Sequence, residues 1–215
     1  LSISNDGYIR TTNPDHERVT QQLWKRCLEK GDIYLDRYSG YYNVKEETFV
    51  TESEAEQCGF KDPTTGAPLE KREEESYFFR MSKYHEPLVA HINANKGFIQ
   101  PEKRRNAILS RLKEPLRDLS ISRNTFEWGV PVPEGGKHVM YVWFDALTNY
   151  LSAVGFPEHG LKAACANAVG KGLWPADCHI IGQDILWFHT VIWPTMLMSA
   201  GVPLPKTVYG PGFVN

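Results

Sequence analysis

The run HIIGQDILWFH, residues 179–189, places residues capable of chemistry in a mostly apolar stretch. Gly182 would let a ligand approach the backbone closely, because glycine has no Cβ. Asp184 presents a carboxylate that could accept hydrogen bonds from a pair of ribose hydroxyls. His189 lies a little over one helical turn further on, so it could face the same crevice. Each residue alone is more typical of a helix cap or a buried core histidine. Together they make a nucleotide site an equally good interpretation.

Aromatic side chains accompany these polar residues: Trp143, Tyr150, Trp187, Phe188 and Trp193. Aromatic stripes usually belong to a core, and we expect this of Phe188. Tyr150 also offers a hydroxyl, and His189 and Trp193 share a helix face at positions i and i+4. The combination predicts a pocket with a large apolar wall and a few polar groups. An unbranched, polarisable side chain such as that of methionine would suit it.

Parallel strands would have to position these residues. The segments VMYVW (139–143), CHIIG (178–182) and KTVYG (206–210) each suit a short buried strand, with helices expected between them. This alternation predicts a parallel sheet with right-handed crossovers. Ligands bind outside the carboxyl ends of such strands, where Gly182, Asp184, Trp143 and Asp145 would lie. We expect Pro194 to bend the helix that follows residue 183.

The first half of the chain predicts different elements. Asn13, Pro14 and Gly31 punctuate a helix with a buried stripe of Val19, Leu23, Cys27 and Leu28. Two short strands with a turn at Ser39-Gly40 are expected next, and residues 51–75 suggest a loop or solvated hairpin. A helical segment is expected from Ser76. The basic helix PEKRRNAILSRLKE follows, and its cations fit an ordinary solvated face better than an RNA contact.

Composition narrows the class of protein. The 215 residues carry a net charge of −2, which gives no overall attraction to nucleic acid or to an anionic membrane, and we expect neither a DNA nor a membrane partner. Cys27, Cys58, Cys165 and Cys178 form no CxxC pair, so a zinc knuckle is not expected. They fit small buried residues of a reducing compartment, the cytoplasm or the mitochondrial matrix. The first residue is not methionine, and we expect a piece of a longer protein.

Several catalytic signatures are missing from these residues: GxSxG, GxxxxGK[ST], GxGxxG and HExxH. A self-contained hydrolase or kinase is therefore poorly supported. The residues alone predict a parallel-sheet half-domain that carries a ribose-binding carboxylate and an aromatic pocket.

Segments spread along nearly the whole chain resemble, in order, the catalytic domain of methionyl-tRNA synthetases, which are class I enzymes. The matching segments include EESYFFRMSKY, NKGFIQPEKRRN, DLSISRNTFEWGVPVP, YVWFDALTNYLSAVGF and HIIGQDILWFHTVIWPTMLMSAGVPLPK. The resemblance implies an α/β fold with a Rossmann-like parallel sheet. It divides the chain into the end of a first Rossmann half (1–30), a small zinc-free connective insertion (31–75) and the return helices with the second Rossmann half (76–215).

The resemblance also implies roles for individual residues. A methionine side-chain site would be lined by Trp143, Ala146, Tyr150, Ile185, His189 and Trp193. The family pattern GxDxxxxH reads GQDILWFH here, so Gly182 and Asp184 would bind the adenosine of ATP. Arg123 is a candidate supporting cation, with a structural ion pair as the equal alternative. No structural metal is expected.

The implied activity is that of a methionine–tRNA ligase, with L-methionine, ATP accompanied by Mg²⁺, and tRNA(Met) as substrates. The catalytic signatures HIGH and KMSKS are not among these residues, so we expect the 215 residues alone to be inactive. Gln183 and Pro211 occupy positions where the family usually has lysine and histidine. These departures favour an alternative, a binding module that holds methionine or tRNA without activating it. The short insertion and the Trp143/Tyr150 pair argue against a synthetase for leucine, isoleucine or valine.

Overall fold

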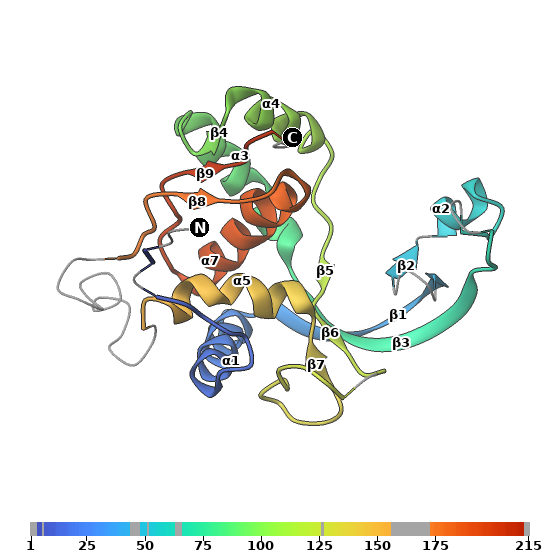
Figure 1. Ribbon diagram of the computed structural model, residues 1–215. Helices are drawn as coiled ribbons and strands as arrows, with labels where there is room; N and C mark the ends of the chain where they lie inside the picture. The colour runs from blue at the N-terminus through green and yellow to red at the C-terminus, as the bar shows by residue number, and fades with distance from the viewer. Residues whose placement is uncertain are drawn as a thin grey trace.

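The computed structural model describes residues 4–5, 7–43, 48–50, 52–62, 66–125, 127–155 and 173–212 (Figure 1). The first helix, α1 (Pro14–Glu29), has the predicted punctuation. The side chain of Asn13 accepts a hydrogen bond of 2.9 Å from the backbone N–H of Asp15, and Gly31 ends the helix region with a φ of +75°. Val19, Leu23 and Cys27 are buried as predicted, and Leu28 packs against the core from a half-buried position.

An antiparallel sheet of order β2-β1-β3-β5 follows. Its strands are β1 (Ile33–Asn43), β2 (Thr48–Val50), β3 (Glu70–Phe79) and β5 (Leu119–Ser120), with α2 (Glu52–Gln57) between β2 and β3. The turn predicted at Ser39-Gly40 is wrong, because β1 runs through it and Gly40 pairs with Arg72. The long partner strand supplies backbone hydrogen bonds that override the local turn signal.

Residues 51–75, predicted as a loop or a solvated hairpin, contain α2 and the first part of β3, with a short antiparallel bridge between Lys61 and Pro68. The helical segment predicted from Ser76 is also wrong at its start, because β3 continues to Phe79. The 3₁₀ helix η1 (Met81–Tyr84) and helix α3 (His85–Ala94) come only after it. The predicted boundary between residues 75 and 76 therefore falls inside a strand, and the division into domains stays a prediction.

A second sheet is parallel and has the order β4-β9-β8. Its strands are β4 (Ile99–Gln100), β8 (His179–Ile180) and β9 (Val208–Tyr209), and α4 (Glu102–Arg111) directly follows β4. The prediction of a mixed α/β fold with a parallel sheet is confirmed. Figure 1 shows α4 and α3 beside this sheet, on the side of the molecule away from α1.

The strand predicted for residues 139–143 is wrong in length and in pairing. Strand β7 (Val139–Met140) is short and pairs antiparallel with β6 (Ser122–Arg123), outside the parallel sheet. Helix α5 (Val142–Ser152) begins directly afterwards and buries Phe144, Leu147, Thr148 and Leu151. These positions repeat at i, i+3, i+4 and i+7, so helical burial of one face wins over the strand preference of the valines.

The helix predicted after residue 183 is built from three segments. They are the 3₁₀ helix η2 (Gln183–Ile185), the π-helix η3 (Phe188–Ile192) and the helix α7 (Trp193–Ala200). Pro194 has no N–H to donate to the carbonyl four residues earlier, which explains the irregular turn preceding it. A π-helical turn often marks a functional site.

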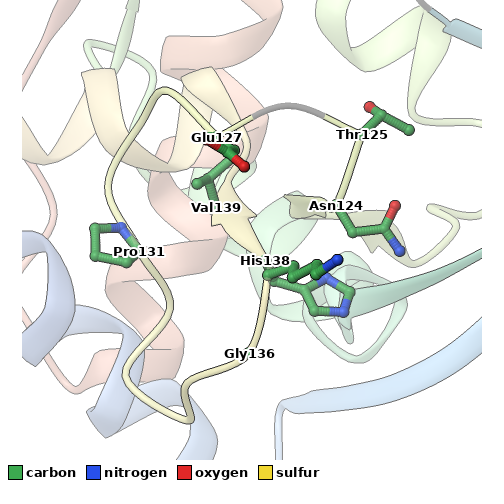
Figure 2. A pocket seen from close by; sticks show the side chains of 8 residues that line it. Asn124, Thr125, Glu127, Pro131, Gly136, His138 and Val139 are labelled. Atoms are coloured by element: carbon green, nitrogen blue, oxygen red, sulfur yellow. The ribbon is translucent and has the colours of Figure 1, made fainter.

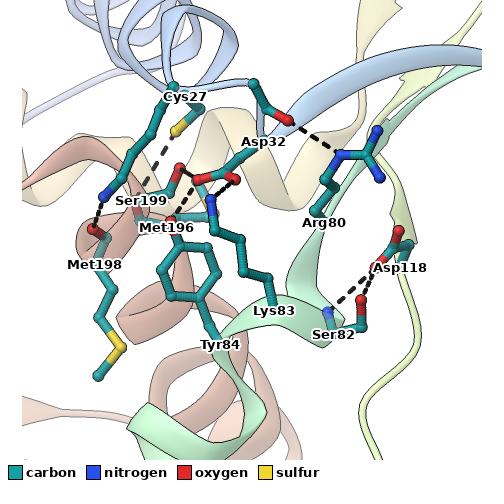
Figure 3. A network of polar contacts seen from close by, with 12 residues as sticks. Cys27, Asp32, Arg80, Ser82, Lys83, Tyr84, Asp118, Met196, Met198 and Ser199 are labelled. Atoms are coloured by element: carbon teal, nitrogen blue, oxygen red, sulfur yellow. Dashed lines mark hydrogen bonds and ion pairs between the residues drawn. The ribbon is translucent and has the colours of Figure 1, made fainter.

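A buried polar network joins α1, β1, η1 and α7 (Figure 3). Asp32 accepts hydrogen bonds from the Lys83 ammonium at 2.6 Å, from the Ser199 hydroxyl at 2.8 Å and from the Tyr84 hydroxyl. Burial alone would raise the pKa of Asp32, but these hydrogen bonds outweigh burial and hold its pKa below the ordinary value. Asp32 is therefore an ionised anchor at the start of β1.

The cysteines fit the prediction of buried residues only in part. Cys27 is buried, and burial raises its pKa to about 12, whereas Cys58 is half-buried and Cys178 is exposed. Cys165 lies outside the described residues. Within the described residues, no helix is both long and apolar enough to cross a bilayer.

Candidate functional site

Helix α5 presents three of the predicted methionine-site residues on one face. Trp143, Ala146 and Tyr150 lie at positions i, i+3 and i+7, and all three are half-buried. The prediction that Trp143 and Asp145 follow a parallel strand is wrong, because both belong to α5. Asp145 instead lies 2.6 Å from His16 Nε2 and so links α5 to α1. The helix, not a strand end, therefore supplies this wall of the site.

The second wall comes from η2, η3 and the start of α7. The Tyr150 hydroxyl and His189 Nε2 are 2.7 Å apart, and His189 Nδ1 lies 3.0 Å from the carbonyl oxygen of Ile185. Because a carbonyl only accepts, Nδ1 carries the proton and Nε2 accepts from the tyrosine. Burial lowers the pKa of His189, opposed by the bond to Ile185, and burial raises the pKa of Tyr150. The pair is therefore a neutral imidazole and a neutral phenol.

Trp193 completes the aromatic cluster at the first residue of α7. Its side chain is fully buried, and its ring centroid lies 6.1 Å from that of Tyr150. Trp143 stacks on Phe188 with a centroid separation of 3.7 Å and an interplanar angle of 16°. Phe188 is half-buried in this stack. The predicted residues of the two walls thus meet where α5 packs against η3.

His179 belongs to the same cluster and was missed from the sequence. Its ring lies 4.0 Å from the Tyr150 ring between centroids, and its Nε2 accepts a hydrogen bond of 3.3 Å from Trp193 Nε1. Burial, and then the neighbouring His189, lower the pKa of His179 to about 4. The available signal was strand alternation, since His179 and Ile181 are buried while Ile180 is 76% exposed.

Gly182 and Asp184 lie just beyond the carboxyl end of β8, as predicted, and both are exposed. A Cβ on Gly182 would be 2.5 Å from Asp184 Oδ1, so the missing side chain leaves room for that carboxylate to lie across the backbone. An exposed carboxylate beside an open backbone at this edge can accept hydrogen bonds from a vicinal diol. The arrangement suits a ribose.

Arg123 is engaged elsewhere. On β6, its guanidinium donates to the Ser120 hydroxyl and the Ser122 carbonyl, both at 2.7 Å, and lies 4.7 Å from the centroid of the Tyr141 ring. These contacts fix it in the antiparallel part of the molecule. Instead of the ion pair considered from the sequence, the described contacts of Arg123 are with neutral groups.

Two cavities lie outside this cluster. The first, of about 400 Å³, borders β6 and β7 and is drawn in Figure 2; its labelled residues include Asn124, Glu127 and His138. The second, of about 220 Å³, lies beside Asp145 and Trp128. Neither is lined by the residues predicted to bind methionine or adenosine. Among the described residues no three His, Cys, Asp or Glu side chains come close enough to hold a metal ion, and the prediction of no structural zinc stays a prediction.

Comparison with known proteins decides the family. The family model described as "tRNA synthetases class I (M)" matches residues 1–64 and 61–215. The chain belongs to this family. It is 49% identical over 217 residues to the methionine–tRNA ligase of Mycobacterium tuberculosis and 51% identical over 213 residues to that of Mesorhizobium japonicum. The alignments cover 100% and 98% of this chain but only 41% and 40% of those relatives.

Solved structures of the class I (M) family agree with the fold. The crystal structure of Mycobacterium tuberculosis methionyl-tRNA synthetase bound by methionyl-adenylate matches with a TM-score of 0.85 at 49% identity, covering 99% of this chain and 41% of that one. The apo form matches with a TM-score of 0.83 at 50% identity, covering 99% of this chain and 42% of that one. The chain therefore spans about two fifths of the synthetases that it resembles.

Proposed function

We propose that this chain forms part of the catalytic core of a methionine–tRNA ligase. The activity would be ATP-dependent activation of L-methionine to methionyl-adenylate, followed by transfer of the methionyl group to tRNA(Met). The observation that carries the proposal is the cluster of Tyr150, His189 and Trp193 beside Gly182 and Asp184. A relative with the same fold, 49% identical, was solved with methionyl-adenylate bound.

The proposed roles follow the chemistry of the groups. Trp143, Ala146, Tyr150, Ile185, His189 and Trp193 would enclose the methionine side chain, with aromatic faces against its thioether. Gly182 and Asp184 would bind the adenosine ribose. The walls are apolar, and the polar groups of Tyr150 and His189 satisfy each other, so the pocket would favour an uncharged side chain.

The proposed reaction has two steps. The methionine carboxylate attacks the α-phosphorus of ATP and pyrophosphate leaves, which forms methionyl-adenylate. A hydroxyl of the terminal adenosine of tRNA then attacks the methionyl carbonyl and AMP leaves. Such chemistry depends on positioning and on stabilising charge rather than on a protein nucleophile. Mg²⁺ would enter with ATP as part of the substrate and offset phosphate charge.

Gln183 and Pro211 favour a second candidate, a binding module that holds methionine or tRNA without activating it. Both positions flank the carboxyl ends of β8 and β9, and neither side chain carries the positive charge that a phosphate would attract. These 215 residues span about two fifths of such relatives, so the activity would belong to the full-length protein, which is called the full chain below. We propose the cytoplasm or the mitochondrial matrix as its compartment.

Amino-acid-dependent ATP–pyrophosphate exchange tests the proposal. The full chain is assayed with each of the twenty amino acids in turn, and we expect exchange with methionine alone. Exchange with another apolar amino acid would refute the methionine assignment. Absence of exchange, combined with methionine binding by calorimetry, would support the binding module instead. Absence of both would refute the pocket itself.

A further inference from the structure

The cations of α4 do not form one solvated face. Lys103 is exposed, but Arg104 in the first turn is half-buried. Arg111, two turns further along, lies 3.8 Å from the centroid of the Trp187 ring. Positions 104 and 111 share one helix face, and they contact Gln183 and Trp187, which belong to the family pattern at residues 182–189. Part of the basic helix is therefore directed at the candidate nucleotide site.

Arg104 joins the carboxyl ends of two neighbouring parallel strands. One terminal nitrogen of its guanidinium donates to the side-chain oxygen of Gln183, which follows β8. Its Nε donates to the carbonyl oxygen of Gly210, which follows β9, at 3.4 Å. This is the edge of a parallel sheet at which ligands bind. Arg104 therefore contacts the residue before Pro211 and the residue before Asp184.

The charge of Arg104 has no described counter-ion. Both acceptors are neutral amide oxygens, and the ion pairs among the described residues do not include Arg104. Removing a cation from water without an opposite charge is unfavourable. A guanidinium has five N–H donors, and the two contacts use only two of them. The site therefore retains both charge and donors for an anion.

We propose that Arg104 is a cation that binds the phosphate groups of ATP. The inference rests on the proposed function, which places adenosine at Gly182 and Asp184. It assigns to α4 the positive charge that Gln183 and Pro211 do not supply at this edge. A planar guanidinium suits phosphate because it donates two parallel hydrogen bonds.

Comparison of adenosine with ATP separates phosphate binding from a purely structural role. Calorimetry on the full chain would compare the wild type with Arg104→Gln, Arg104→Lys and Lys103→Gln. We expect Arg104→Gln to weaken ATP by about tenfold or more, the order of one hydrogen bond to a charged group, and to leave adenosine unchanged. Lys103→Gln removes the same charge from an exposed position of the same helix and should change neither ligand.

The lysine variant keeps the inference testable if Arg104→Gln does not fold. It retains the charge but not the two parallel N–H donors of arginine. ATP should therefore bind several-fold more weakly than to the wild type, by about one lost hydrogen bond, and adenosine should bind equally well. Equal losses of adenosine and ATP in either variant would overturn the inference, since they indicate that Arg104 only holds the strand ends. Unchanged ATP binding would overturn it too. A wild type that binds neither nucleotide would instead refute the proposed function.

Discussion

At the scale of single residues, the Tyr150 hydroxyl has two possible acceptors. In the structure it donates to Nε2 of His189, whose other nitrogen is committed to the Ile185 carbonyl. A thioether sulfur is a weak acceptor, so a bound methionine would have to compete with the imidazole for one proton. The hydroxyl would therefore contribute little net energy toward sulfur, and the aromatic walls would supply most of the affinity.

Tyr150→Phe tests this balance. We expect the variant to weaken methionine by a few-fold more than norleucine, in which a methylene replaces the sulfur, because a neutral hydrogen bond is worth about 1 kcal/mol at most here. Calorimetric titration with both ligands measures the difference. Tyr141→Phe removes a hydroxyl from a tyrosine that contacts Arg123 instead, and should affect neither ligand. Equal weakening of both ligands by Tyr150→Phe would exclude a role at the sulfur.

Residue types and spacing identified much of the candidate cluster but not its geometry. Tyr150, His189 and Trp193 could be grouped because two of them share a helix face and the third carries a hydroxyl. His179 was missed because strand alternation indicates only that its side chain is buried, not that it contacts Tyr150 and Trp193. Arg104 was assigned to a solvated face because helix periodicity cannot show which neighbour covers which side. Both assignments depend on tertiary contacts that the local sequence does not encode.

At the scale of elements, Asp32 shows how a single carboxylate orders several segments. It lies between α1 and β1 and accepts hydrogen bonds from η1 and α7 (Figure 3). Its side chain is fully buried, whereas the Lys83 side chain is 49% exposed. Since α7 begins with Trp193, the network also helps to position one wall of the candidate pocket. The buried hydroxyl bonds, more than the half-exposed ion pair, should carry the energy.

Asp32→Asn should lower the free energy of unfolding by about 2 kcal/mol at neutral pH, because it removes a charge that accepts several hydrogen bonds. Lys83→Met should cost less, about 1 kcal/mol or below. The folded pKa of Asp32 lies below its unfolded value of 3.8, so this stability is complete above that value and is lost as pH falls through the folded pKa. Urea unfolding at pH 7 and pH 3 measures both effects. An equal cost of the two substitutions would show that the ion pair dominates.

Elements whose signals are local were predicted well, and those that depend on partners were not. Helix α1 carries its own cap, first-turn proline and terminal glycine, and its bounds match. Residues 139–143 contain strand-forming valines, yet the strand ends at Met140 and α5 begins at Val142, because Phe144, Leu147 and Leu151 bury one helix face. The long pairing of β1 with β3 likewise overrides the turn signal at Ser39-Gly40. Strand pairing was the least predictable feature, since it joins residues far apart in sequence.

At the scale of the whole molecule, the parallel sheet with the candidate site and the distal part of the antiparallel sheet form separate regions. Figure 1 shows β2, α2 and the far ends of β1 and β3 projecting from the remainder of the structure. The main hydrophobic core includes Ile33 and Phe79, at the near ends of the two long strands. Ala55 and Leu69 are buried but stand outside that core. The projecting hairpin, residues 39–73, therefore has a small core of its own and should contribute little to the pocket.

Removal of the projecting hairpin tests this independence. Tyr38 and Glu74 are directly paired, so a two-residue Asn-Gly turn in place of residues 39–73 closes the remaining ladder from Ile33↔Phe79 to Tyr38↔Glu74. We expect the shortened full chain to bind methionine with the affinity of the wild type, measured by calorimetry, because the deleted residues contribute nothing to the described main core. A second variant with a Gly-Gly turn controls for the chosen junction. If both lose methionine binding while their far-UV circular dichroism shows a folded protein, the hairpin supports the pocket through contacts beyond the described residues, and the two regions are coupled.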